Sequence, residues 1–219
     1  MNKEKLKIAL AGNPNSGKST LFNSLTGLNQ KVGNYPGITV DKRIGSCRLS
    51  ENQKAEIIDL PGTYSLYPKS IDERVTQQIL CNTQDLDYPD VTIIIADATN
   101  LRKSILLLSQ IIDLKMKVIL ALNMLDISRN MGIVIDIDNL SRKLGVPVVS
   151  INARKKQGVE KLKEKILSVE NPKKEILNVK EIFPELIEKG NEIRESENNY
   201  ATFLSLCKQK LNNNSAVKI

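Results

Sequence analysis

The feature that most constrains this chain is the run Gly12-Asn13-Pro14-Asn15-Ser16-Gly17-Lys18-Ser19, which fits the pattern G-x-x-x-x-G-K-S. An apolar stretch over residues 6–11 precedes it, and a helix predicted over residues 18–25 follows it. Glycines let a backbone wrap around a phosphate, while the loop amides and the helix N-terminus supply partial positive charge. The context therefore predicts a phosphate-binding loop, in which Lys18 contacts the outer phosphates and Ser19 ligates Mg²⁺.

The rest of the sequence alternates short apolar runs with amphipathic stretches, which is typical of a mostly parallel sheet with helices on both faces. The predicted strands are 6–11, 43–49, 55–59, 91–97, 117–123 and 146–151, and the predicted helices are 18–25, 71–81, 101–114, 137–144 and 159–169. The polar turn Ser50–Gln53 is too short for a crossover helix, so its flanking strands should form an antiparallel hairpin. We expect an α/β fold with a six-stranded sheet and one antiparallel edge strand.

The chain is expected to divide at a linker. Residues 1–170 should form the α/β domain and residues 171–219 a short C-terminal helical appendage, because Asn171-Pro172-Lys173-Lys174 combines charge with a proline that disfavours helix before it. Apolar positions spaced for two helices follow, but so small a segment cannot hold a core alone. It should pack on the first domain, pair with another chain, as in a homo-oligomer, or belong to a longer protein.

A second motif, Asp59-Leu60-Pro61-Gly62, closes the predicted strand 55–59. Its position puts the Asp59 carboxylate at the carboxyl edge of the sheet, on the same side as the phosphate-binding loop. There Asp59 can hold Mg²⁺ through the ion's water shell, and the Gly62 amide can contact the γ-phosphate of a nucleotide.

A third motif, Asn123-Met124-Leu125-Asp126, closes the predicted strand 117–123. A carboxylate at Asp126 can accept both hydrogen bonds from the N1 and N2 edge of guanine, which adenine cannot supply. Many GTPases have lysine at the position of Met124, so an apolar side chain here predicts weaker nucleotide binding and fast exchange. Three motifs in this order predict the P-loop GTPase fold, with GTP or GDP as ligand.

Composition excludes several kinds of chemistry and partner. The chain has no histidine, which excludes histidine bases and histidine-ligated metals. The net charge of +7 comes with only 4% aromatic residues, which disfavours a protein that binds single-stranded nucleic acid.

The sequence predicts a cytoplasmic chain. The N-terminus is charged and has no signal-peptide core, and no apolar run approaches the roughly 18 residues of a membrane span.

The residues within and between the motifs carry a resemblance to one family. The run from Gly12 to Asn23, the run Val32-Gly33-Asn34-Tyr35-Pro36-Gly37-Ile38-Thr39-Val40 and the run from Asp59 to Leu66 resemble the N-terminal cytosolic G domain of FeoB ferrous iron transporters. The resemblance implies a GTPase module at the inner face of the cell membrane, tethered to a permease domain of the same polypeptide that moves Fe²⁺. It also implies that a helical domain follows and slows the loss of GDP.

The same resemblance assigns roles to further residues. Thr39 would be the switch threonine that joins Mg²⁺ and the γ-phosphate. Asn13 would help to hold K⁺ between the α- and γ-phosphates, a charge analogous to an arginine finger. Asn152 stands where related proteins have serine in the loop beside the base. Thr63 replaces the glutamine that orients the attacking water in many GTPases, so we expect hydrolysis to be slow, and Asn13 leads us to expect it to be K⁺-stimulated.

The candidate residues are therefore the following. Those expected to contact the nucleotide are Gly12, Asn13, Pro14, Asn15, Ser16, Gly17, Lys18, Ser19, Thr20, Gly37, Ile38, Thr39, Asp59, Gly62, Asn123, Met124, Asp126, Asn152, Ala153 and Arg154. Those expected to act in catalysis are Lys18, Thr39, Asn13 and Gly62, and those expected to hold metal are Ser19, Thr39 and Asp59 for Mg²⁺ and Asn13 for K⁺.

Two other interpretations stay open. A soluble GTPase of the ribosome-assembly or tRNA-modifying type is favoured by the net charge and by the shared motifs. A sensor that binds GTP and regulates a partner by occupancy, with negligible turnover, is favoured by Thr63.

Overall fold

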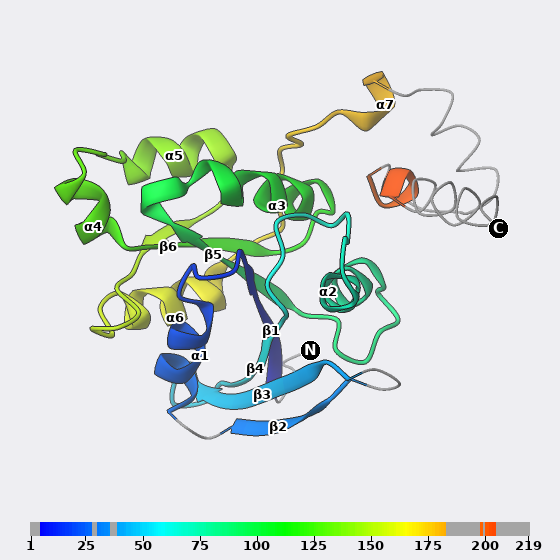
Figure 1. Ribbon diagram of the computed structural model, residues 1–219, viewed down its shortest axis with the longest axis horizontal. Coiled ribbons are helices and arrows are strands. Elements are labelled where there is room, and N and C mark those ends of the chain that lie inside the picture. The colour runs from blue at the N-terminus through cyan, green and yellow to red at the C-terminus, as the bar shows by residue number, and fades with distance from the viewer. Residues whose placement is uncertain (1–4, 28–29, 36–38, 183–197, 199, 205–219) are drawn as a thin grey trace.

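The computed structural model describes residues 5–27, 30–35, 39–182, 198 and 200–204 (Figure 1). Within these residues seven strands form one sheet in the order β2-β3-β4-β1-β5-β6-β7. The strands are β1 (Lys5–Gly12), β2 (Gln30–Asn34), β3 (Asp41–Arg48), β4 (Lys54–Asp59), β5 (Val91–Asp97), β6 (Val118–Asn123) and β7 (Val148–Ser150). The helices are α1 (Lys18–Thr26), α2 (Ile71–Cys81), α3 (Arg102–Asp113), α4 (Leu125–Asn130), α5 (Ile137–Leu144), α6 (Val159–Ser168) and α7 (Val179–Ile182), with a 3₁₀ turn, η1 (Ala98–Asn100).

The direction of the strands confirms a mostly parallel sheet. Among the described strands, β4, β1, β5, β6 and β7 run parallel to one another, and β3 runs antiparallel to both β2 and β4. The predicted hairpin is present as β3 and β4, closed by a hydrogen bond of 3.0 Å from the Leu49 amide to the Gln53 carbonyl. The predicted count of six strands was one short, because β2 covers the outer side of β3, and the antiparallel strand lies one place in from the edge.

Helices cover both faces of the sheet, as the alternation in the sequence predicted (Figure 1). Successive side chains of β1 point to opposite faces. Ile8 and Leu10 pack in an apolar cluster with α1 and α6, whereas Ala9 and Ala11 pack in a second cluster with α2 and α3. All four residues are fully buried, so the central strand is covered on both sides. No helix among the described residues combines the length and the apolar character that a membrane crossing requires.

The described part of the C-terminal appendage lies against the end of α3. The Asp113 carboxylate accepts hydrogen bonds from the backbone amides of Ile176, at 2.6 Å, and Leu177, at 3.0 Å. Desolvation by burial raises the pKa of Asp113 even though these two hydrogen bonds lower it. Tyr200 and Leu204 join the apolar cluster of α2 and α3. The described appendage therefore packs on the first domain. The division at residue 171 stays a prediction, and residues 183–197 and 205–219 lie outside the described residues.

Candidate functional site

The phosphate-binding loop connects the end of β1 to the start of α1, as the motif requires. Gly17 has a φ of 93°, and a Cβ atom there would lie 2.3 Å from Nδ2 of Asn123. A Cβ atom at Gly12 would lie 2.5 Å from the carbonyl oxygen of Ile95 on the neighbouring strand β5. Both positions admit only glycine, because nothing larger fits between the loop and the strand ends behind it.

Lys18 and Asp59 meet at the carboxyl edge of the sheet. Asp59 ends β4, pairs in register with Leu10 of β1, and forms an ion pair with the Lys18 ammonium. The Lys18 side chain is only 12% exposed and the Asp59 side chain only 6%. The structure therefore brings together the residue predicted to contact phosphate and the residue predicted to hold Mg²⁺. A carboxylate at Asp59 and a hydroxyl at Ser19 supply the oxygen ligands that Mg²⁺ prefers, so the residues present fit this ion.

Asn13 contributes a buried side-chain amide to the phosphate-binding loop. Its side chain is buried, its Nδ2 donates to Oγ of Ser104 at 3.2 Å, and its Oδ1 has no hydrogen-bond partner among the described residues. A buried carbonyl oxygen without a partner is costly, and in native proteins such a group commonly serves a ligand or an ion. Amide and carbonyl oxygens are the donors that coordinate K⁺ in proteins. Asn13 therefore fits the K⁺ role that the family resemblance implies.

Asn123 ties the phosphate-binding loop to the loop predicted beside the base. Its Nδ2 donates to the carbonyl of Ser16 at 3.0 Å, and its Oδ1 accepts from the amide of Ala153 at 3.2 Å. Asp126, on the first turn of α4, accepts at Oδ2 from Nδ2 of Asn152 at 3.1 Å. The asparagine that replaces the expected serine thus still restrains the carboxylate predicted to recognise guanine.

Two adjoining cavities lie over these residues. One has a volume of about 760 Å³ and the other about 210 Å³, and Gly17, Thr20 and Met124 line both. The larger cavity is otherwise lined by Asn13, Pro14, Asn15, Lys18, Ser19, Gly62, Ser70, Asp72 and Glu73. The smaller is otherwise lined by Asn123, Asp126, Ile127, Asn152, Ala153, Arg154 and Lys155. One continuous site therefore joins the residues predicted for the phosphates to those predicted for the base.

Some predicted residues lie elsewhere. Thr39 is exposed and lines neither cavity, and Gly37 and Ile38 lie outside the described residues. Thr63 is fully buried; its hydroxyl donates to the carbonyl of Ser65 at 2.7 Å, and its amide donates to the carbonyl of Gly12 at 3.1 Å. Its side chain is thus held inside the protein, where it cannot orient a water molecule in the cavity.

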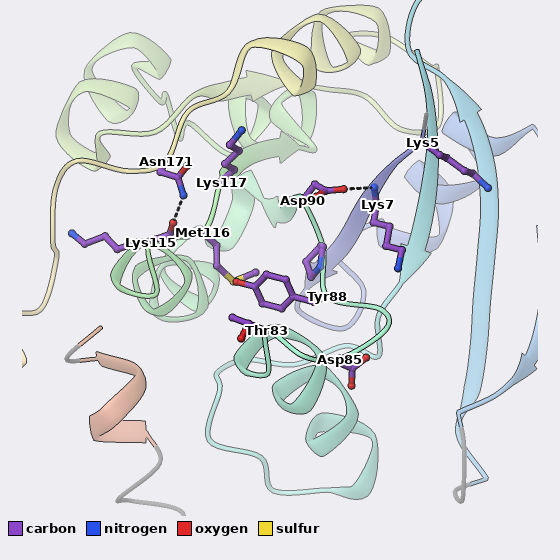
Figure 2. Close-up of a pocket in the computed structure, with 11 residues that line it drawn as sticks. Lys5, Lys7, Thr83, Asp85, Tyr88, Asp90, Lys115, Met116, Lys117 and Asn171 are labelled. Atoms are coloured by element: carbon purple, nitrogen blue, oxygen red, sulfur yellow. Dashed lines mark hydrogen bonds between the residues drawn. The ribbon is translucent and has the colours of Figure 1, made fainter. Parts of the chain in front are cut away.

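A third cavity, of about 630 Å³, lies at the opposite, amino edge of the sheet and contains none of the motif residues (Figure 2). Its lysines mostly have partners within the protein. Lys5 pairs with Glu56 at 2.7 Å, Lys115 pairs with Glu175 at 3.0 Å, and the ammonium of Lys7 donates to the carbonyl of Leu86. We therefore place the functional site at the carboxyl edge.

The family model described as ferrous iron transport protein B matches residues 6–166. The chain belongs to this family. A curated relative, the Fe(2+) transporter FeoB of Methanocaldococcus jannaschii, is 45% identical over 105 residues, which are 48% of this chain and 15% of the relative. The chain thus spans a small part of the relatives' length.

Solved FeoB structures share the fold. The G domain of the T. maritima FeoB iron transporter is 41% identical, with a TM-score of 0.69, and the alignment covers 75% of this chain and 98% of that one. The cytosolic domain of T. maritima FeoB in its GMPPNP form is 38% identical, with a TM-score of 0.78, and the alignment covers 91% of this chain and 79% of that one. The chain has the P-loop GTPase fold of FeoB G domains.

The sequence did not predict the environment of two buried polar side chains, Ser104 and Tyr35. Ser104 contacts Asn13 from α3, and the only signal in the sequence was a single serine on an otherwise apolar helix face. Tyr35, which follows β2, is buried with its hydroxyl lacking a partner among the described residues, and Lys42 lies 5.6 Å from the centre of its ring. Desolvation by burial raises the pKa of Tyr35. A tyrosine in a glycine- and proline-rich loop gave no indication that it would be buried.

Proposed function

We propose that this chain binds GTP with Mg²⁺ and hydrolyses it slowly, as the regulatory G domain of a ferrous iron transporter. The observation that carries the proposal is the continuous site that runs from Lys18 to Asp126. Lys18 supplies an ammonium for the outer phosphates, and the Asp126 carboxylate selects guanine through its N1 and N2 hydrogens. The GMPPNP form of the T. maritima relative supports a nucleoside triphosphate as the ligand.

The proposed hydrolysis depends on backbone groups and bound cations. Gly62 lies close to the phosphate-binding loop, since a Cβ atom there would be 3.1 Å from Cγ of Pro14, so its amide can face the γ-phosphate. Thr63 offers no side chain to the attacking water, which predicts a slow reaction. Asn13, whose Oδ1 has no hydrogen-bond partner in the described part of the chain, would hold K⁺. A cation there would supply positive charge as the phosphate oxygens become more negative.

The proposed role is that of a switch. GTP would order Gly33, Asn34, Tyr35, Thr39 and Val40 and the segment after Asp59, and hydrolysis would release them; residues 36–38 lie outside the described residues. The partner would be a membrane permease domain of the same polypeptide, which fits a chain that matches only 15% of the M. jannaschii transporter. The G domain would then lie in the cytoplasm at the inner face of the membrane, and the C-terminal helical segment would slow the release of GDP.

The test is to measure the rate at which phosphate is released from GTP, with Mg²⁺ present, in KCl and in NaCl of equal concentration. We expect wild type to be faster in KCl and Asn13→Ala to lose that advantage. Asn52→Ala removes an exposed asparagine from the turn between β3 and β4 and serves as the matched control. An Asn13→Ala variant that keeps its response to K⁺ would contradict the proposed role of Asn13.

The same experiment separates the alternatives. A protein that binds GTP but releases no detectable phosphate in KCl would be a nucleotide sensor. Salt-sensitive binding to RNA, measured in parallel, would favour a ribosome-assembly or tRNA-modifying GTPase.

A further inference from the structure

Asn13 is oriented by a residue that lies far from it in the sequence. Ser104, in the first turn of α3, accepts a hydrogen bond of 3.2 Å from Nδ2 of Asn13. Both residues are deeply buried, at 6% and 1% exposure respectively. Because Nδ2 is committed to Ser104, the Oδ1 atom of the same amide is the one without a partner among the described residues.

Ser104 is an exception on its helix face. The inward face of α3 has the spacing i, i+3, i+4, i+7, and the other three positions, Leu107, Leu108 and Ile111, are fully buried apolar residues. A serine on this face is a poorer helix former than alanine and gains little from apolar burial. Its hydroxyl must therefore have a polar partner, and Asn13 is the partner that the structure records.

The direction of the Asn13 amide decides what this residue can bind. An asparagine amide has a carbonyl oxygen on one side and an NH₂ group on the other, and a half-turn of the side chain exchanges them. Asn13 lines the same cavity as Lys18, so an NH₂ group there would add a donor beside an ammonium. With NH₂ on Ser104, the carbonyl oxygen is available instead, and a carbonyl oxygen can coordinate a cation.

We propose that Ser104 is a positioning residue for cation binding. Its hydroxyl accepts the hydrogen bond from Nδ2 of Asn13 and so directs Oδ1 toward a monovalent cation beside the phosphates. Ser104 itself acts only through Asn13 and contacts neither the cation nor the nucleotide. The inference rests on the proposed function, because the cation is expected only beside bound GTP.

The test measures binding, so that it does not depend on turnover. The affinity for GMPPNP with Mg²⁺ is determined by calorimetry in KCl and in NaCl of equal concentration. Wild type should bind GMPPNP more tightly in KCl than in NaCl. In Ser104→Ala the ratio of the two affinities should fall about fivefold, which corresponds to the loss of one hydrogen bond. The affinity of Ser104→Ala in NaCl should be unchanged. Ser104→Thr keeps the hydroxyl and should keep the advantage.

Ser109→Ala is the matched control, since it removes a serine from the same helix whose hydroxyl donates to the Leu106 carbonyl at 2.8 Å. Thermal unfolding shows which variants are folded. The inference is wrong if folded Ser104→Ala keeps the full K⁺ advantage, if it loses affinity equally in both salts, or if wild type shows no K⁺ advantage. The last result would leave nucleotide binding intact, whereas wild type that binds no GMPPNP in either salt would overturn the proposed function and the inference with it.

Discussion

Replacing Gly17 by alanine tests how the phosphate-binding loop is held. Gly17 has a left-handed backbone, with a φ of 93°, and a new Cβ atom would lie 2.3 Å from Nδ2 of Asn123. That contact forces the Asn123 amide to move. The amide makes two hydrogen bonds, to the Ser16 carbonyl and from the Ala153 amide, which join the phosphate-binding loop to the loop beside the base.

The expected cost follows from these contacts. The left-handed conformation costs a non-glycine residue about 1 kcal/mol. Loss of the two Asn123 hydrogen bonds adds about 1 kcal/mol each. We therefore expect Gly17→Ala to lower the free energy of unfolding by about 3 kcal/mol, measured by urea denaturation followed by circular dichroism. GTP binding, measured by calorimetry, should weaken as well because the two loops are no longer joined.

Gly132→Ala is the control for backbone strain. Gly132 has a φ of 77°, and a Cβ atom there would meet no atom within 4 Å. Gly132→Ala should therefore lower the free energy of unfolding only by the cost of the backbone strain, about 1 kcal/mol, and should leave GTP binding unchanged. If Gly17→Ala costs no more than Gly132→Ala, the close approach of Asn123 does not hold the loop and the reasoning is refuted.

Three further predictions concern single side chains. Tyr35→Phe removes a buried hydroxyl that has no hydrogen-bond partner among the residues the structure describes, and it should raise the free energy of unfolding by about 1 kcal/mol. Burial raises the pKa of Tyr35 in the folded protein, so its hydroxyl loses its proton at a lower pH in the unfolded chain. The free energy of unfolding of wild type should therefore fall as the pH rises above 10.0. Urea denaturation at several pH values should show a smaller fall for Tyr35→Phe. Asp113→Ala should speed hydrogen exchange at the backbone amides of Ile176 and Leu177, which donate to the Asp113 carboxylate. Unchanged exchange at these amides would contradict this contact. Asn152→Ala should release GDP about fivefold faster in stopped-flow fluorescence, because Asp126 loses a restraining donor, and an unchanged rate would show that the restraint is unimportant.

Much of the fold follows from apolar patterning. The parallel strands β1, β5 and β6 contain continuous buried apolar runs, and the turn between β3 and β4 is too short for anything but a hairpin. Strand β2 could not be predicted in this way, because all five of its residues are exposed and no alternation of apolar and polar residues marks it. Its place is decided by pairing with β3, which is a tertiary contact.

The candidate site was predicted best where motifs follow strands. Parallel strands end at one edge, so Asp59 and Asn123 had to lie near the phosphate-binding loop once the sheet was known. The contact of Asn13 with Ser104 joins residues 91 positions apart, and no local pattern reports it. Thr39 was predicted to contact Mg²⁺ and the γ-phosphate, and this role depends on a nucleotide-bound arrangement. In this structure Thr39 is exposed and lines neither of the two adjoining cavities.

The most direct test of a GTP-binding domain is a calorimetric comparison of GTP and ATP, each with Mg²⁺, on wild type and on Asp126→Asn. The site geometry predicts saturable binding of GTP and none of ATP by wild type, and loss of GTP binding in Asp126→Asn because the amide offers only one acceptor to the guanine edge. Equal affinity of wild type for the two nucleotides, or an Asp126→Asn variant that binds GTP as wild type does, would contradict the account.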